Sequence, residues 1–260
     1  MGWDYFLNSF LIKDEKRICM KKTLWIVLAV LVLVIGGAYF YFNTSPSQFA
    51  EEAGNSTKKV DVVDDSGFLM FTPMNQDVKK SVIFYPGAFI DALSYAPMAK
   101  GLANAGYKVY IAEMPLGLAV FGQDKAADII DSHEDEHFVI GGHSLGGAMA
   151  ARFAHENMDE LDGIFFLASY ADEKGTLAKA PFSALSITAT KDGVLNWDTY
   201  EKNKKYLPEN TTFVSIKGGN HAQFGAYGKQ NGDNEATISV EEQTKETVTA
   251  LKTWLAVAVK

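Results

Sequence analysis

The residues with the strongest chemical signal are Gly142-His143-Ser144-Leu145-Gly146, which match the pattern G-x-S-x-G. An apolar segment leads into this pattern, and an alanine-rich segment with helical spacing leaves it. Such a sharp turn from strand to helix holds a serine in strained geometry with its hydroxyl exposed. Glycines on either side remove side chains that would collide there. The pattern in this setting predicts that Ser144 is a nucleophile.

A serine hydroxyl is a weak nucleophile, so a base must accompany it. The chain contains five histidines, and His221 fits the role best. It follows an expected strand and comes late in the chain, as the order Ser, Asp, His requires. His143 lies inside the turn itself, where its side chain is expected to point away from the site. The other three precede the elbow strand or lie far along the following helix: His133, His137 and His155.

The acid that orients this histidine is expected just past a strand between the serine and the histidine. Asp192, in Thr188-Ala189-Thr190-Lys191-Asp192-Gly193, meets that condition. A carboxylate there fixes the tautomer of the imidazole and stabilises the imidazolium ion. Three other aspartates remain alternatives: Asp162, Asp172 and Asp198.

Negative charge on the reacting oxygen requires hydrogen-bond donors. The helix that begins at Leu145 presents a free backbone N–H and a positive partial charge. A second donor is expected from the turn Pro86-Gly87-Ala88-Phe89, with the N–H of Ala88 preferred and that of Phe89 as the alternate. Five apolar residues in the surrounding loops could line a substrate pocket, although core packing explains each equally well: Phe89, Leu116, Leu118, Phe121 and Phe224.

A competing motif, His133-Glu134-Asp135-Glu136-His137, satisfies H-E-x-x-H, a zinc-site pattern. Zinc binding would need both histidines on one face of a helix together with a third ligand. Here the motif falls at an expected helix end and opens directly into the strand at 138–141. A solvated charged connection is therefore expected, and neither a metal nor a cofactor is predicted.

Strand and helix patterns alternate along residues 60–260, which predicts an α/β fold with a largely parallel sheet and helices on both faces. A polar turn at 64–66 separates two strands of an expected hairpin. The expected strands are 60–63, 67–72, 80–85, 108–113, 138–141, 163–168, 185–189 and 212–216; the expected helices are 94–105, 117–133, 145–157, 196–206 and 240–257.

These residues resemble the α/β-hydrolase superfamily, specifically its short members without a cap, which are similar to dienelactone hydrolases. The resemblance covers about residues 60–260 and rests on the segments at 85–88, 113–116, 142–147, 190–193 and 220–225. It implies an eight-stranded sheet, a Ser–Asp–His triad and carboxylic-ester chemistry. Dienelactone hydrolases proper use a cysteine nucleophile, whereas this chain has Ser144. The connection at 172–181, where many relatives insert a lid, is short, which predicts an open site for a small or terminally presented substrate.

The amino-terminal region has a different character from this body. Residues 1–22 carry five basic and three acidic side chains, and residues 23–42 carry none. The remaining 19 basic and 29 acidic side chains give the body a net charge of −10, within the −8 of the whole chain. An acidic body argues against nucleic acid as a partner, because phosphate binding requires a basic face.

The uncharged segment at 23–42 is long enough to span the hydrocarbon core of a bilayer as a helix, at about 1.5 Å per residue. The basic residues precede it, so the positive-inside rule places residues 1–22 in the cytoplasm and the body outside. A cleaved signal peptide, leaving a secreted protein, is the alternative. The predicted organisation is a basic tail at 1–22, an anchor at 23–42, a polar linker at 43–59 and a catalytic domain at 60–260.

Composition limits the remaining possibilities. Apolar residues make up 47% of the 260 residues and charged residues 22%, which excludes a disordered or collagen-like chain. The single cysteine, Cys19, excludes an internal disulfide. The favoured function is a membrane-anchored serine hydrolase of small esters. An acyltransferase with the same triad and a non-catalytic surface protein with the same fold are the alternatives.

Overall fold

The computed structural model describes residue 25, residues 44–133 and residues 136–257. The expected tail at 1–22 and, apart from Trp25, the expected anchor at 23–42 lie outside the described residues. No helix within the described ranges has both the length and the apolar character needed to cross a membrane. The description below concerns the unit that begins at Thr44.

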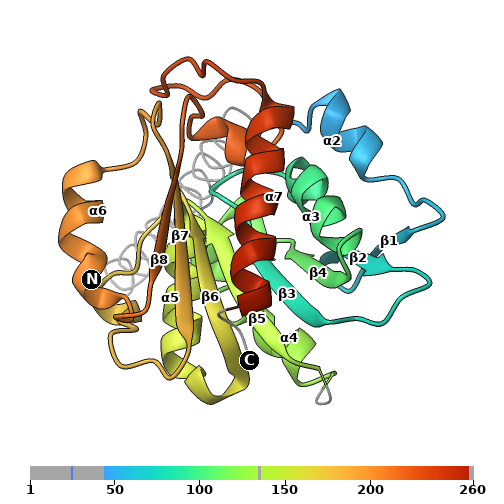
Figure 1. Cartoon of the computed structure of the whole chain (residues 1–260), viewed down its shortest axis with the longest axis horizontal. Helices are drawn as coiled ribbons and strands as arrows, with labels where there is room; N and C mark the ends of the chain where they lie inside the picture. Colours follow the sequence, from blue (N-terminus) through green and yellow to red (C-terminus); the bar gives the residue numbers. More distant parts are fainter. Residues whose placement is uncertain (1–24, 26–43, 134–135, 258–260) are drawn as a thin grey trace, which may run out of the picture. The chain divides into compact units, whose positions relative to one another are not determined.

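The centre of this unit is an eight-stranded sheet with the strand order β1-β2-β4-β3-β5-β6-β7-β8 (Figure 1). Strands β4 to β8 run parallel with β3, whereas β2 is antiparallel to both β1 and β4. The predicted eight-stranded, mostly parallel sheet is therefore confirmed. The strands are β1 (Val60–Asp65), β2 (Phe68–Pro73), β3 (Lys80–Tyr85), β4 (Tyr107–Ala112), β5 (Phe138–His143), β6 (Leu161–Leu167), β7 (Ser183–Ala189) and β8 (Thr212–Ile216).

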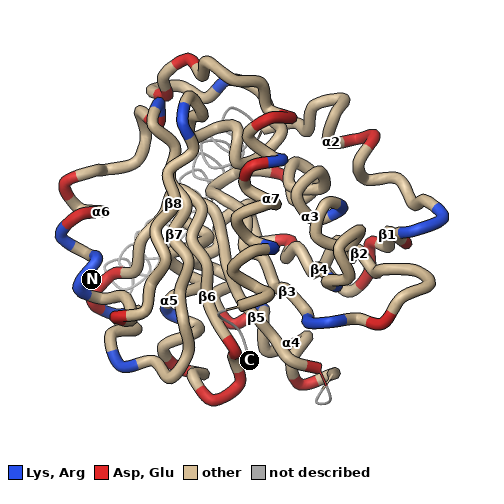
Figure 2. The backbone as a smooth tube through the Cα atoms, in the orientation of Figure 1, with Lys and Arg blue, Asp and Glu red and all other residues tan. Residues whose placement is uncertain are grey.

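The apolar content of each strand follows its place in the sheet. Every residue of the central β5 and of β7 is buried, and apart from His143 at the end of β5 these strands consist of apolar or small residues. The edge strands β1 and β8 are half exposed and carry more polar residues. Figure 2 shows the same distribution, because charged residues occupy helices, loops and strand ends and leave the middle of the sheet free of them.

Helices cover both faces of the sheet and form two apolar layers. One layer joins the sheet to α3 and α7, and the other joins it to α4 and α5. Figure 1 shows α7 in front of the sheet and α5 behind it. The α-helices are α2 (Gln48–Ala53), α3 (Ala96–Ala103), α4 (Lys125–Ile130), α5 (Leu145–Glu156), α6 (Trp197–Asn203) and α7 (Val240–Val257); the 3-10 turns are η1 (Ala92–Tyr95), η2 (Pro115–Gly117), η3 (Ala119–Phe121), η4 (Met158–Glu160), η5 (Glu173–Gly175), η6 (Lys204–Tyr206) and η7 (Ala222–Phe224).

Residues 44–59 differ from the expected polar linker. The N–H of Ser47 donates to the carbonyl of Ala226 at 2.7 Å, and the Ser47 hydroxyl caps α2. Helix α2 then buries Ala50 and Ala53, packing beside α3. Two small apolar residues in a polar segment give too weak a periodicity to predict such a helix. The folded unit therefore includes the segment that was expected to be a tether.

The expected helix at 117–133 is also shorter than its sequence pattern indicated. Leu116 and Gly117 adopt left-handed backbone conformations, with φ of 54° and 69°, and such residues cannot continue a right-handed helix. Two 3-10 turns follow, and α4 starts only at Lys125. The buried Tyr85 hydroxyl fixes that start, because it accepts the N–H of Ala126 at 2.8 Å and donates to the Gln123 carbonyl.

The turn between β5 and α5 depends on a close approach that only glycine permits. A Cβ atom on Gly146 would lie 2.1 Å from the carbonyl oxygen of Tyr85 and 2.3 Å from that of Pro86. We expect Gly146→Ala to lower the free energy of unfolding by at least about 3 kcal/mol, because backbone atoms of β3 must move. Urea denaturation of the full-length protein measures the loss.

Gly232→Ala is the matched control. Its Cβ would meet no atom within 4 Å, but Gly232 has a φ of +84°. Only backbone strain of about 1–2 kcal/mol then opposes the substitution. Equal losses in the two variants would show that the approach at Gly146 is not what constrains the turn.

Candidate active site

Ser144 occupies the junction between β5 and α5 in a strained conformation, with φ of 51° and ψ of −124°. Its N–H donates to the carbonyl of Leu167 at 3.0 Å, and its carbonyl accepts the Ser169 hydroxyl at 2.6 Å. Left-handed backbone costs a non-glycine residue about 1–3 kcal/mol and persists where its surroundings determine it. The strand, sharp turn and helix expected around Ser144 are all present.

His221 and Asp192 form a buried pair beyond the carboxyl ends of β8 and β7. The Nδ1 atom of His221 lies 2.9 Å from Oδ2 of Asp192, and both residues are almost fully buried. The second carboxylate oxygen, Oδ1, accepts the backbone N–H groups of Val194 and Leu195 at 2.9 and 2.8 Å. The carboxylate is thus held in place on both oxygens, and it orients the ring of His221.

The opposite ring nitrogen, His221 Nε2, is buried and has no hydrogen-bond partner among the described residues. His221 and Ser144 line one cavity of about 270 Å³. A histidine that is held at Nδ1, has an unpartnered Nε2 and lines the same cavity as a serine has groups suited to accept a proton there.

The three alternative aspartates lie in other surroundings. Asp162 accepts Lys80 Nζ at 2.5 Å, and Asp172 pairs with Arg152. Asp198 is exposed in the first turn of α6. Asp192 is the aspartate that contacts His221 within the described part of the chain.

His143 does not point away from this site as expected. Its buried ring lies against the ring of His221, with centroids 4.5 Å apart. Its Nδ1 atom lies 2.9 Å from the hydroxyl of Tyr95, which in turn accepts the N–H of Gly87 at 3.0 Å. Burial and the nearby His221 lower the pKa of His143 well below the usual range. A neutral His143 therefore packs beside His221 and adds no full positive charge there.

The backbone N–H groups of the expected oxyanion donors differ in whether they already have an acceptor. Leu145 opens α5, so its N–H has no acceptor within the helix. The Phe89 N–H donates to the carbonyl of Gly117 at 2.7 Å and is therefore engaged elsewhere. The N–H of Ala88 makes no hydrogen bond with any described residue. Ala88 and Leu145 remain the predicted pair.

The five apolar residues predicted for the pocket do not line the cavity at Ser144. Leu116 and Phe121 are exposed, and Phe224 is buried against the ring of His143. Four of the five lie in loops after β3 and β4, and Phe224 follows β8, whereas most of the cavity lining follows β5, β6 and β7. Its lining is Ser144, Leu145, Ala148, Ala168, Ser169, Tyr170, Val194, Leu195, Asn196 and His221.

Two residues whose hydrogen bonds support the site are not predicted from the sequence. Asp233 accepts the N–H groups of both Gly193 and Ala222, at 2.9 and 2.8 Å, and so joins the acid turn to the histidine turn. Buried Gln243 on α7 donates to the Asn220 carbonyl and accepts the Asn220 N–H. Neither residue belongs to a local pattern, because each acts across a gap of 10 or more positions in the chain.

The H-E-x-x-H residues do not form one helical face where they are described. Helix α4 ends at Ile130, before His133, and His137 stands exposed at the entrance to β5. Glu134 and Asp135 lie outside the described residues. Within the described ranges, no group of three His, Cys, Asp or Glu side chains is arranged to hold a metal ion.

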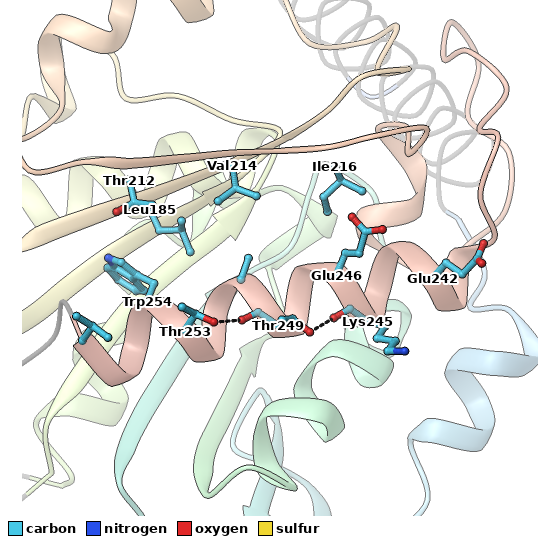
Figure 3. Close-up of a pocket in the computed structure, with 12 residues that line it drawn as sticks. Leu185, Thr212, Val214, Ile216, Glu242, Lys245, Glu246, Thr249, Thr253 and Trp254 are labelled. Atoms are coloured by element: carbon cyan, nitrogen blue, oxygen red, sulfur yellow. Dashed lines mark hydrogen bonds between the residues drawn. The ribbon is translucent and has the colours of Figure 1, made fainter.

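A larger groove, of about 770 Å³, lies between β8 and α7 (Figure 3). Aliphatic residues of the sheet form one side, and the α7 residues Thr249 and Thr253 form part of the other. These hydroxyls donate to carbonyls one turn earlier, those of Lys245 and Thr249. The groove includes neither Ser144 nor His221, so its size does not make it the reactive site.

Comparison with known proteins identifies the family. Residues 81–245 match the family model described as the alpha/beta hydrolase family. The chain belongs to this family, which confirms the resemblance and the enzyme class indicated by the sequence. No curated protein matches the chain.

Similar solved structures support the same fold. Est1E from Butyrivibrio proteoclasticus is 13% identical, with a TM-score of 0.54 over 76% of this chain and 99% of that one. The esterase domain of a Rhodothermus marinus protein is 12% identical, with a TM-score of 0.57 over 76% and 98%. MGS-MChE2, an alpha/beta hydrolase from a Mar Chica lagoon sediment metagenome, is 15% identical, with a TM-score of 0.57 over 75% and 98%. At these identities the likeness concerns the fold alone.

The lowered pKa of His143 predicts a pH dependence of stability. Below about pH 6.5 the unfolded chain binds a proton at this histidine while the folded chain does not, so stability falls as the pH falls. Between pH 6.5 and 5.5 we expect the unfolding free energy to drop about 1 kcal/mol more in the natural protein than in His143→Gln. Urea denaturation at both pH values measures this difference. Identical slopes would show that His143 does not remain neutral in the folded protein.

Proposed function

We propose that this protein is a serine hydrolase that cleaves carboxylic esters through Ser144, His221 and Asp192. The observation that carries the proposal is the buried His221–Asp192 pair: Nε2 of His221 has no hydrogen-bond partner among the described residues, and His221 lines the same small cavity as the strained Ser144. Membership of the alpha/beta hydrolase family supports it. Est1E, similar in fold, has been crystallised with ferulic acid bound.

The proposed reaction begins when Ser144 Oγ attacks the ester carbonyl carbon and His221 Nε2 takes the hydroxyl proton. Asp192 keeps Nδ1 protonated and stabilises the imidazolium ion that forms. The N–H groups of Ala88 and Leu145 stabilise the oxyanion. The carbon–oxygen bond of the leaving group breaks, and His221 returns the proton to the departing alcohol. Water then enters by the same path, releasing the carboxylic acid and restoring Ser144.

Ester hydrolysis by three variants tests the triad. We expect Ser144→Ala and His221→Ala each to lower kcat by about 10⁴-fold or more, because nucleophile and base act as a unit. Asp192→Asn should cost about 10⁴-fold, because the amide favours the wrong imidazole tautomer. A panel of p-nitrophenyl esters provides the assay, and added alcohols reveal any acyl transfer as a new ester product.

Asp198→Asn is the matched control, because it changes an exposed aspartate six positions from Asp192. It should leave kcat and KM unchanged. Full activity in Ser144→Ala, or no labelling of the natural protein by a fluorophosphonate probe, would rule out Ser144 as the nucleophile.

We further propose that residues 23–42 anchor the enzyme in a membrane, with residues 1–22 in the cytoplasm and the catalytic domain on the outer side. Support comes from the uncharged composition of 23–42 and the basic residues before it.

The sole cysteine provides a topology test. A membrane-impermeant maleimide should label Cys19 only after right-side-out vesicles are opened. In a Cys19→Ser background, Phe213→Cys, at an exposed position of β8, should be labelled in intact vesicles. Labelling of Cys19 in intact vesicles would reverse the orientation, and loss of the amino-terminal segment on maturation would show signal-peptide cleavage instead.

A further inference from the structure

An exposed apolar loop stands at the carboxyl edge of the sheet. The loop, residues 114–123, follows β4 and contains no charged residue. The side chains of Leu116 and Phe121 are about three-fifths exposed, at 62% and 61%, and Val120 is also exposed. Large apolar side chains clustered on a surface mark a site that another apolar phase or partner covers.

Hydrogen bonds join this apolar loop to the place where the chain enters the domain. The carbonyl of Gly117 accepts the N–H of Phe89 at 2.7 Å, and the carbonyl of Phe89 accepts the N–H of Thr44 at 2.9 Å. Phe89 belongs to the turn that follows β3 and holds the predicted oxyanion donor Ala88. The chain entry, the oxyanion turn and the apolar loop are therefore consecutive neighbours on one edge of the sheet.

The short stretch of chain between the expected membrane segment and the domain limits which surface can lie next to this edge of the sheet. The expected membrane segment ends at Phe42, and Thr44 is already hydrogen-bonded to Phe89. A single residue, Asn43, spans only about 3.5 Å when extended. Because residues 44–59 pack on the domain, they do not form a free tether, and in the proposed topology Thr44 lies one residue from the end of the membrane segment.

We propose that the apolar loop at 114–123 inserts into the surface of the bilayer that holds residues 23–42, and that the substrate is an ester carried by an amphiphile in that bilayer. This inference rests on the proposed function and the proposed anchor. The cavity at Ser144, about 270 Å³, is smaller than the usual 300–1,000 Å³ of ligand pockets. It takes in the ester and a short group attached to it, while the rest of the amphiphile stays in the membrane.

The charged residues around the apolar loop indicate which kind of lipid headgroup the loop can approach. Glu113 and Asp124 flank the loop, and both are exposed. Partial burial, and then the nearby Asp64 and Asp91, raise the pKa of the Glu113 carboxyl, while Lys125 offsets part of this effect. This acidic rim is repelled by anionic headgroups, so a zwitterionic surface is favoured.

A spin label measures the insertion directly, without reliance on catalysis. The full-length Cys19→Ser/Leu116→Cys protein carries a nitroxide at 116 and is placed in phosphatidylcholine nanodiscs; Cys19→Ser/Phe213→Cys is the control. At 116 we expect accessibility to oxygen to exceed accessibility to a water-soluble nickel complex severalfold, with the reverse at 213. High nickel accessibility at 116 would overturn the proposal. Low accessibility to both reagents would show that a second protein copy covers the loop, and this also overturns it.

Activity then tests the substrate class. In the triple variant Leu116→Ser/Val120→Ser/Phe121→Ser, we expect kcat/KM for a short-chain ester of a phospholipid analogue in phosphatidylcholine vesicles to fall about tenfold, because apolar burial at the surface is lost. The value for p-nitrophenyl acetate in solution should stay unchanged. Phe213→Ser is the matched control and should alter neither value.

The outcomes separate the two proposals. If the natural protein hydrolyses neither ester, the proposed function fails, whatever the spin label shows. If it hydrolyses the soluble ester, and the triple variant keeps full activity on vesicles, the proposed function stands and the membrane-surface substrate is excluded.

Discussion

The site depends on one constraint, the left-handed backbone of Ser144 at the end of β5. This conformation is unfavourable for a serine, and the hydrogen bond from its N–H to the Leu167 carbonyl holds it there. Gly146 allows the turn to lie directly against the carbonyls of Tyr85 and Pro86. The neighbouring strands β3 and β6 therefore have to be in register before the serine can be presented. The mostly parallel sheet thus serves as a rigid support for the hydroxyl of Ser144.

A second network holds His221 on the same edge of the sheet. Asp192 receives two backbone N–H groups on one oxygen and His221 on the other, so its position follows from the turn after β7. Asp233 joins that turn to the histidine turn, and Gln243 ties the histidine turn to α7. Buried hydrogen bonds resist movement, because breaking one leaves a group unpaired in a low-dielectric interior. The bonds on Asp192 and on the histidine turn thereby hold the ring of His221 through its Nδ1 atom.

The folded unit begins at this same edge of the sheet. Thr44 pairs with Phe89 in the turn that follows β3, and α2 packs onto α3 immediately afterwards. The segment at 44–59 is thus part of the folded unit, and it meets the domain beside this turn.

The sequence by itself determined the local features. The elbow at 142–146, the alternation of strands and helices, and the late Asp192 and His221 all carry short-range signals, since turns and periodicity depend on neighbouring residues. Tertiary structure decided the rest. The contact of His143 with His221, the bridges made by Asp233 and Gln243, the cavity lining and the packing of 44–59 join residues far apart in sequence. Such contacts follow from the order of strands in the sheet, which brings distant loops to one edge, and no local pattern of residues encodes that meeting.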